Sequence, residues 1–499
     1  MTRWARLSAC LGAFLALCVG IHPVNAQEGG ASRDWVNLLR PPAWLSDFNP
    51  IGHQLDTIEE AIPNLHIRGL LWNQTRIPLN NHSWDFDSIE FLGELELQWR
   101  PTPTLEVVNI WHQLYDAIYD WDHYWRSQRE IEQEMEYYHS HKRYLRELYV
   151  RWLATPNLVI TAGKHQQVWG KIDFQLIDII NPNDRRLGNI YRLSDAEYRR
   201  IPTWMVSTRY TFGEKAYVEA TWNPDFEPEP DLPTRTVFTG SRFLKKLKVD
   251  KPSEAFKNHE WFLRGGFSWK GFDTMLFYGN YWSDLPVFFF KNFNPTRLPI
   301  ATIEPKHTRQ HSFGLAFDKN FTFFGRPMLL IYENKYDLNV YLPEFRGMGD
   351  LFSILARRTR GHRDDAWRKM NIMTQGFEID TVWGPRQHYT FISGVFNVHV
   401  FGWDGKVPVP NARHRNLTVA FYTINIPVWW LEDRLQVGHS ANFALEDGGG
   451  QALFEMAYKL SDYLSTSVRW YSNWGNQNDR PDGIFRDRDM LDFRIKYEF

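Results

Sequence analysis

Cysteine is almost absent from this chain of 499 residues, which holds only Cys10 and Cys18. Both lie near the N-terminus, in a segment with the features of a removable leader, so we expect a mature chain without cysteine. This excludes a small secreted scaffold held by disulfides and a Cys-X-X-Cys redox motif. A long exported chain then needs another source of stability, and closure of a large sheet is one.

Long apolar runs are also missing. No mature segment approaches the ~20 apolar residues that a membrane-spanning helix needs, although the chain holds 23 Trp, 22 Tyr and 35 Phe. A backbone inside a bilayer must satisfy its hydrogen bonds within the protein, which leaves helices or closed β-barrels. Membrane residence would therefore require a barrel.

The chain lacks a strong excess of charge of either sign, because 57 Lys and Arg oppose 59 Asp and Glu. This mild acidity argues against a nucleic-acid partner. A nucleophile elbow and a Walker-type phosphate loop are missing as well. We predict no catalytic residues, no cofactor and no metal site.

The first 26 residues have the layout of a secretory signal peptide. Arg3 and Arg6 precede an uncharged apolar stretch, Leu7–Ile21, and a small residue, Ala26, precedes Gln27. The stretch is too short for a membrane-spanning helix and closes on a cleavage-like site. We predict removal of residues 1–26 and residence in the outer membrane of a Gram-negative bacterium.

Strict alternation marks the last strand. Its apolar residues alternate with charged ones: Leu491, Phe493, Ile495, Tyr497 and Phe499 with Asp492, Arg494, Lys496 and Glu498. An apolar side toward lipid and a charged side toward a wet lumen explain this better than a soluble sandwich strand. The terminal aromatic residues, Tyr497 and Phe499, resemble the signal read by the barrel-assembly machinery. We therefore predict that machinery and outer-membrane lipid as partners.

The same alternation recurs upstream, for example in Ile89–Trp99 and Leu148–Trp152. Segments such as Ile89–Trp99 are about ten residues long, the length that a tilted membrane strand needs. Charged side chains lie on the face opposite the apolar one. We predict that they line a lumen: Glu90, Glu94, Glu96, Glu147, Arg151, Lys459, Arg469, Arg494 and Lys496.

The whole chain contains about 18 such segments, but those near Phe317 to Leu329 are weak, so 16 stays open. The connections alternate in length. Short turns include Pro156-Asn157 and Ser461-Asp462, and the long loops are Asp116–Ser140, Lys171–Arg200, Pro224–Asn258, Ser283–His307 and Leu338–Trp367. The sequence therefore predicts an all-β fold, a transmembrane antiparallel barrel of 16–18 strands with short periplasmic turns and long extracellular loops.

The barrel is predicted over residues 65–499. Residues 27–64 lack the alternation, and we expect them to form a periplasmic or plugging segment with a helical turn around Leu55–Ala61.

One loop carries more information than the others. It runs from the predicted strand Leu158–His165 through Gln166-Gln167-Val168-Trp169-Gly170-Lys171 and an Asn-Pro turn to Arg-Ile-Pro-Thr-Trp-Met. Asn-Pro initiates a turn, and opposite charges could pin the loop inside the barrel mouth. The plainer alternative is that these charges are solvated. Our candidates for the constriction are Lys164, Trp169, Lys171, Asp173, Asp178, Asn181, Pro182, Asp184, Arg185, Arg199, Arg200 and Pro202.

The Gly-Lys-X-Gln-X-X-Trp-Gly-Lys-X-Asp run, the Asn-Pro-X-Asp-X-Arg turn and the Arg-Ile-Pro-X-Trp-Met return resemble an outer-membrane family, domain of unknown function thirteen-oh-two. The resemblance lies mainly in Leu145–Met205. It implies a porin-like barrel, often encoded beside exporters of the resistance-nodulation-division (RND) type and periplasmic lipid-handling proteins. As partners it implies such an exporter and a periplasmic carrier, and as cargo it implies hydrophobic molecules.

Two classes of function remain, and a third reading stands beside them. In the first, the protein is a porin-like channel or transport component for hydrophobic or amphiphilic small molecules, with the loop 171–200 as its constriction. In the second, it is an outer-membrane enzyme that acts on lipids, although no local motif demands this. In the third, it is a plugged barrel that serves as a scaffold for an envelope transport complex.

Overall fold

The structure is a computed structural model that describes residues 49–499 apart from 80–85, 122–143, 173–175, 184–197, 199, 230–248, 250, 292–301, 344–366, 385–388, 404–414, 447, 476–485 and 487. The predicted signal peptide and residues 27–48 lie outside the described residues.

Eighteen strands form one sheet. The first nine are β1 (Leu65–Pro78), β2 (Ser88–Thr102), β3 (Leu105–Asp116), β4 (Leu145–Thr155), β5 (Leu158–His165), β6 (Thr203–Phe212), β7 (Ala216–Asn223), β8 (Glu260–Trp269) and β9 (Phe272–Trp282). The other nine are β12 (Arg309–Phe323), β13 (Arg326–Pro343), β14 (Trp367–Trp383), β15 (Tyr389–Val400), β16 (Asn416–Pro427), β17 (Leu435–Ala444), β18 (Gly450–Lys459), β19 (Leu464–Trp474) and β20 (Met490–Glu498).

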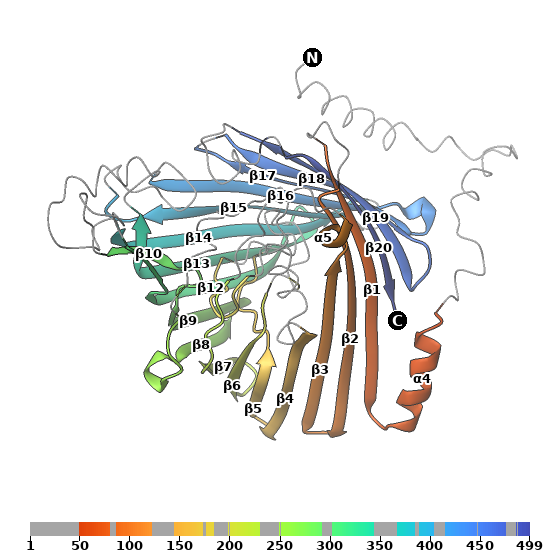
Figure 1. Cartoon of the computed structure of the whole chain (residues 1–499), viewed down its shortest axis with the longest axis horizontal. Helices are drawn as coiled ribbons and strands as arrows, with labels where there is room; N and C mark the ends of the chain where they lie inside the picture. Colours follow the sequence, from red (N-terminus) through yellow and green to blue (C-terminus); the bar gives the residue numbers. More distant parts are fainter. Residues whose placement is uncertain are drawn as a thin grey trace, which may run out of the picture. The chain divides into compact units, whose positions relative to one another are not determined.

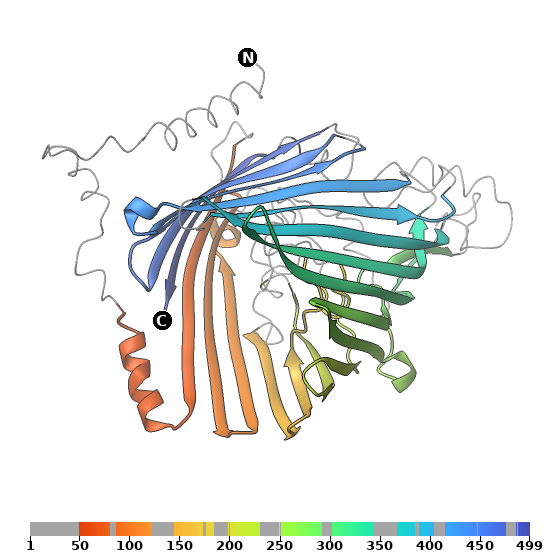
Figure 2. The same cartoon turned by 180° about the vertical axis from the view of Figure 1, so that it is seen from behind.

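Each strand pairs antiparallel with the next, and β20 pairs with β1, which closes the ring (Figure 1, Figure 2). The predicted transmembrane antiparallel barrel is therefore confirmed, at 18 strands rather than 16. The weak segments near Phe317 to Leu329 form β12 and β13, which pair from His311↔Leu338 to Phe323↔Arg326. Within the described residues, no helix is both long and apolar enough to cross a membrane.

The described residues form several further elements, of which α4 precedes β1 and the others lie in connections between strands. They are α4 (Gly52–Ala61), α5 (Ile118–Trp121), η1 (Phe256–Asn258), η4 (Trp429–Leu431) and a separate hairpin of β10 (Val287–Lys291) and β11 (Thr302–Lys306). One predicted boundary was wrong, since the loop expected from Leu338 begins only after Pro343. A bulge between Asp337 and Val340, with Asn339 at a φ of 58°, lets β13 continue past that point.

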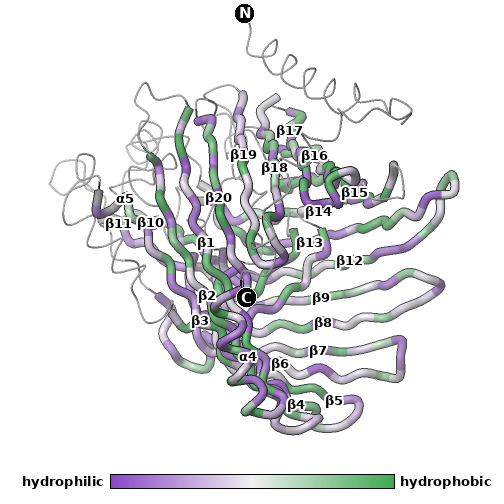
Figure 3. Tube along the Cα trace, turned by 90° about the vertical axis from the view of Figure 1, so that its right-hand side faces the viewer, coloured by the Kyte–Doolittle hydropathy of each residue, from purple (hydrophilic) through white to green (hydrophobic). Residues whose placement is uncertain are grey.

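Polar and apolar residues alternate along the strands (Figure 3). Large apolar side chains remain exposed on the outward face, among them Phe91, Trp111, Trp152, Leu276, Phe377 and Ile495. Such a continuous apolar exterior would be unfavourable in water but suits the hydrocarbon of a bilayer. The outward positions of β20, which include Phe493 and Ile495, follow the predicted alternation.

The seam between β1 and β20 lies where the chain's last residue meets its first strand. Gly69 and Phe499 exchange both backbone hydrogen bonds, at N···O distances of 2.8 and 2.9 Å. The first residues of β1, before Gly69, extend beyond the end of β20. There the side chain of Glu59 from α4 accepts the N–H of Ile67. Helix α4 therefore lies beside the start of β1, outside the ring of strands (Figure 1).

Closure of the ring predicts a specific crosslink. Thr75 and Phe493 are register partners across the seam, and opposed residues of antiparallel strands lie within disulfide range. Residues 27–499 contain no cysteine, so within them the variant Thr75→Cys/Phe493→Cys should form a disulfide under mild oxidation. Non-reducing electrophoresis of the denatured protein would then show a faster band.

The matched control is Thr75→Cys/Leu276→Cys. It keeps the cysteine on β1 and places the second one on β9, which does not pair with β1. It should give no intramolecular crosslink. A crosslink in the control alone, or in neither variant, would contradict the closed strand order.

Candidate functional site

The connection between β5 and β6 is held together by one carboxylate, Asp178. Its Oδ1 accepts the backbone N–H groups of Trp169 and Gly170 at 3.0 and 2.9 Å. Its Oδ2 accepts two hydrogen bonds from Arg200, at 2.9 Å from Nε and 2.7 Å from Nη2. Both partners of this ion pair are largely buried, so the connection is a folded structure rather than a solvated loop in the part described.

Asn181 and Pro182 fix the return of the chain. Asn181 Oδ1 accepts the Gln167 N–H at 2.8 Å, and its Nδ2 donates to the Ile201 carbonyl at 2.9 Å. The Pro182 carbonyl accepts the Ile201 N–H at 2.8 Å. The outgoing and returning arms are therefore tied side by side, as the Asn-Pro motif predicts.

The apolar side chains of the loop pack against the inner wall of the barrel. Trp169, 2% exposed, lies edge-on to Phe262 and Phe277, with ring centroids 6.1 and 5.8 Å apart. These rings belong to one buried cluster, whose loop members also include Ile177, Ile179 and Ile180 and whose wall members also include Met205, Met275, Tyr281 and Ala316. A Cβ at wall residue Gly279 would lie 2.5 Å from Ile179 Cδ1, so the glycine leaves room for the loop.

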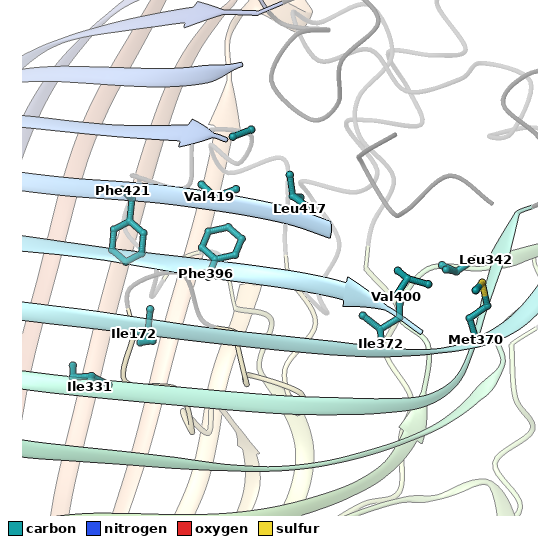
Figure 4. Close-up of a cluster of buried hydrophobic side chains, with 11 residues drawn as sticks. Ile172, Ile331, Leu342, Met370, Ile372, Phe396, Val400, Leu417, Val419 and Phe421 are labelled. Carbon is teal, nitrogen blue, oxygen red and sulfur yellow. The ribbon is translucent and has the colours of Figure 1, made fainter. Parts of the chain in front are cut away.

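A second apolar surface lies on inward positions of β13–β17, beside buried polar residues of the same strands such as Glu333, Glu378 and Asn442. Ile172 from the loop lies among its residues Ile331, Phe396 and Phe421 (Figure 4). The other buried members are Leu342, Met370, Ile372, Val400, Leu417, Val419 and Ala444. We call this surface the apolar arc. It departs from the predicted pattern, in which inward faces carry charge.

The inward faces of β18–β20 and β1–β4 carry charged side chains, and we call this surface the charged arc. Its ion pairs include Arg76–Glu90 at 2.9 Å, Arg469–Glu455 at 2.9 Å and Arg151–Glu106 at 2.8 Å. Asp492, wholly buried, accepts a hydrogen bond from Gln74 and lies 3.5 Å from Arg76. Opposite charges are paired across neighbouring strands, which offsets the cost of their burial.

A cavity of about 570 Å³ lies against the charged arc near the C-terminus. Basic and acidic side chains share its wall. It is lined by Arg68, Gly69, Leu70, Glu94, Glu96, Tyr198, Arg494, Lys496, Glu498 and Phe499.

Tyr198 brings the loop to this cavity and to the charged arc. Its ring packs on Trp72 of β1 and His112 of β3, with centroids 6.3 and 5.9 Å apart, and Arg146 of β4 lies 5.3 Å from its centre. The loop also packs on β6, β8 and β9 through Trp169 and its neighbours. It therefore contacts two separate parts of the inner wall.

The structure brings together seven of the predicted loop residues: Trp169, Lys171, Asp178, Asn181, Pro182, Arg200 and Pro202. Asp173, Asp184, Arg185 and Arg199 lie outside the described residues. Lys164 lies elsewhere, because its register partners Leu148 and Trp204 are on the outward face of the barrel. Its ammonium donates to the Leu145 carbonyl at 2.7 Å.

The predicted lumen residues Glu90, Glu94, Glu96, Glu147, Arg151, Lys459, Arg469, Arg494 and Lys496 all fall on inward register positions. Sequence reasoning missed several of their partners. Arg76 was missed because β1 alternates poorly, and Arg146 because a bulge opposite Ile110/Trp111 inserts it into β4. Two further inward-facing acids, Glu219 and Glu333, were also missed. Glu219 pairs with Arg264, and Glu333 accepts the backbone N–H groups of Lys171 and Ile172; these partners are remote in sequence.

Asp178 offers a direct test of the folded loop. Asp178→Ala would leave the Arg200 guanidinium and two N–H groups without their acceptor, at a cost of about 3 kcal/mol in loop docking. Trypsin should then cleave after Arg200 roughly 100-fold faster, as measured by mass spectrometry of the fragments.

Asp178→Asn is the matched control. It keeps an oxygen for the two N–H groups but loses the charge, so cleavage should be intermediate. Equal cleavage rates in the wild-type protein and both variants would show that Asp178 does not hold the loop.

Comparisons with solved structures return several outer-membrane barrels at low identity. Pseudomonas aeruginosa OpdK with vanillate is 10% identical, with a TM-score of 0.47, over 88% of this chain and 99% of that one. Pseudomonas aeruginosa OccK2 (OpdF) in complex with glucuronate is 10% identical, with a TM-score of 0.48, over 88% and 98%. Salmonella typhi OmpF in complex with daunomycin is 9% identical, with a TM-score of 0.37, over 87% and 97%.

The closed strand order of this chain itself, rather than these likenesses, establishes the barrel. No curated protein matches the chain. A family model described as "Protein of unknown function (DUF1302)" matches residues 79–342. This match spans more than half of the chain and includes the whole folded loop, and the chain therefore belongs to the DUF1302 family.

Proposed function

We propose that the protein is an outer-membrane channel for hydrophobic or amphiphilic small molecules, and that the loop 171–200 is its constriction. The observation that carries this proposal is the apolar arc. Phe396, Val419 and Phe421 are buried on the inner wall, in part beneath Ile172 and Leu176 of the loop, and a path for small hydrophilic solutes needs no such apolar wall. An apolar solute that takes the place of these loop side chains would gain free energy by contacting the same surface.

The presence of both arcs, which adjoin where β17 pairs with β18, supports the amphiphilic part of the proposal. An apolar body would contact β13–β17, while polar groups would face the paired charges of β18–β20 and β1–β4. An 18-stranded ring leaves a passage unless something fills it, and the described part of the loop lies within that space. The loop would then set the size and polarity of what passes.

Conductance tests the constriction. The purified protein should form ion-conducting channels in planar bilayers, and replacing residues 171–200 by a short Gly/Ser linker should raise the single-channel conductance several-fold. The physical reason is the removal of side chains from the narrowest part of the lumen. An unchanged conductance in a variant that still folds would overturn the constriction.

Permeation of an apolar solute tests the apolar arc. Val419→Asn places an amide on that surface and should slow entry of an apolar fluorescent dye into proteoliposomes several-fold, with ion conductance changed less than twofold. Thr423→Val, at an inward position of the same strand, should not slow it. If the two variants slow the dye equally, the apolar arc does not carry the solute.

Two alternatives lead to different results. A lipid-acting enzyme would release product from labelled phospholipid, and one serine substitution would abolish the release. A plugged scaffold would neither conduct nor turn over lipid. The family resemblance, and not the geometry, is the source of the proposed partners, an RND-type exporter and a periplasmic carrier.

A further inference from the structure

The start of the folded loop occupies a defined seat on the apolar arc. Ile172, 2% exposed, and Leu176 pack against the inward faces of β13–β16. Gly376 of β14 makes the space, because a Cβ there would lie 2.5 Å from Leu176 Cδ1 and 3.2 Å from Ile172 Cδ1. The two loop side chains therefore fill a pocket that the wall itself forms.

A buried carboxylate lies at the edge of this seat. Glu333 of β13 is wholly buried, and its Oε1 accepts the N–H of Lys171 and, at 3.1 Å, the N–H of Ile172. Its Oε2 is also buried and has no hydrogen-bond partner among the described residues. The residues opposite Glu333 in register are small, Ala316 and Gly376. The seat thus retains an acceptor that the described part of the loop does not satisfy.

Two further carboxylates surround the same point. The Lys171 ammonium forms an ion pair with Asp318 of β12, and Asp273 of β9 is the register partner of Asp318. Burial lowers the pKa of the Lys171 amine, while the negative charges of Asp273 and Glu333 act to raise it. The neighbouring cation Arg264 is already held by Glu219, at 3.0 and 3.1 Å. One lysine therefore faces three carboxylates.

We propose that this seat is a binding site for a cationic amphiphile, and that the loop residues Lys171, Ile172 and Leu176 occupy it in place of the ligand. The apolar body of the ligand replaces Ile172 and Leu176. Its ammonium or guanidinium group replaces the Lys171 ammonium and donates to Glu333. The inference rests on the proposed function, since it names the class of solute that the channel would take.

The chemistry of the seat selects the charge of the ligand. If the loop leaves, Glu333 loses both N–H donors and Asp318 loses its cation, and buried acceptors without donors are strongly unfavourable. An amphiphilic carboxylate would add a fourth negative charge at the same place. A neutral amphiphile would replace the apolar contacts but leave the acids without a cation. A cationic amphiphile replaces both, so it competes with the loop.

Cysteine labelling at the seat tests the proposal. In a mature chain with Ile172→Cys as its single thiol, reconstituted in nanodiscs, a water-soluble maleimide should react slowly because the side chain is buried. Decylammonium, below its micelle concentration, should raise the labelling rate at least tenfold. Decanoate, which has the same chain length and the opposite charge, should leave it unchanged.

Three controls make the result specific. Asp318→Asn/Glu333→Gln should reduce the rate ratio with and without decylammonium to near one, whereas Glu214→Gln, in the exposed turn between β6 and β7, should retain it. A reporter at the remote buried residue Leu453→Cys should not respond, which excludes general loosening of the barrel by the probe.

Equal effects of decylammonium and decanoate, or no effect of either, would overturn the proposed ligand class. An unchanged ratio in the double variant would overturn the role of the carboxylates. The labelling does not require an open pore. A protein that conducts but fails this test contradicts the ligand class alone, and a protein that passes it without conducting contradicts the channel.

Discussion

The structure depends on the need of every backbone N–H and C=O group inside a bilayer to find a partner within the protein. A sheet meets that need only if its two edges meet, so the pairing of β1 with β20 is the constraint from which the rest follows. It places the chain's last residue, Phe499, against Gly69 at the turn side of the barrel. It also gives each strand one face toward lipid and one toward the lumen, so that lumen chemistry is set by every second residue.

The lumen chemistry is uneven around the ring. Paired charges line β18–β20 and β1–β4, whereas the inward positions of β13–β17 carry a buried cluster of aliphatic and aromatic side chains together with some buried polar residues. The loop between β5 and β6 makes use of both surfaces, because Ile172 packs on the apolar arc and Tyr198 packs on Trp72 of the charged arc. Its internal ion pair, Asp178–Arg200, gives it a shape of its own between these anchors. The loop is therefore a fixed part of the lumen wall.

Most of the barrel could be predicted from the sequence because a strand of a membrane barrel explains the alternation of apolar and charged residues in β2, β4 and β20 better than a strand of a soluble sandwich does. The Asn-Pro turn and the pairing of Asp178 with an arginine could also be anticipated, because the interacting residues lie within one sequence motif. The apolar arc could not. In β16, Leu417, Val419 and Phe421 alternate with Thr418, Ala420 and Tyr422, and hydropathy alone does not tell which set faces inward.

Lys164 shows a second limit. It belongs to the loop motif by sequence, but β5 continues through His165, and the two-residue period of the strand turns Lys164 outward. Glu333 shows a third, because its role depends on backbone groups that lie more than 160 residues earlier in the chain. Local patterns predict the strands and their faces, whereas contacts between a loop and a distant strand require the closed structure.

The central claim is that the loop between β5 and β6 is docked on the inner wall of the barrel. Hydrogen exchange of the loop amides in the native protein tests this claim most directly. The N–H groups of Trp169, Gly170, Lys171 and Ile172 all donate to buried or largely buried carboxylates. They should exchange as slowly as the amides of the neighbouring strands β5 and β6. Exchange at the rate of an unstructured peptide would show that the loop is not docked, and would contradict the account.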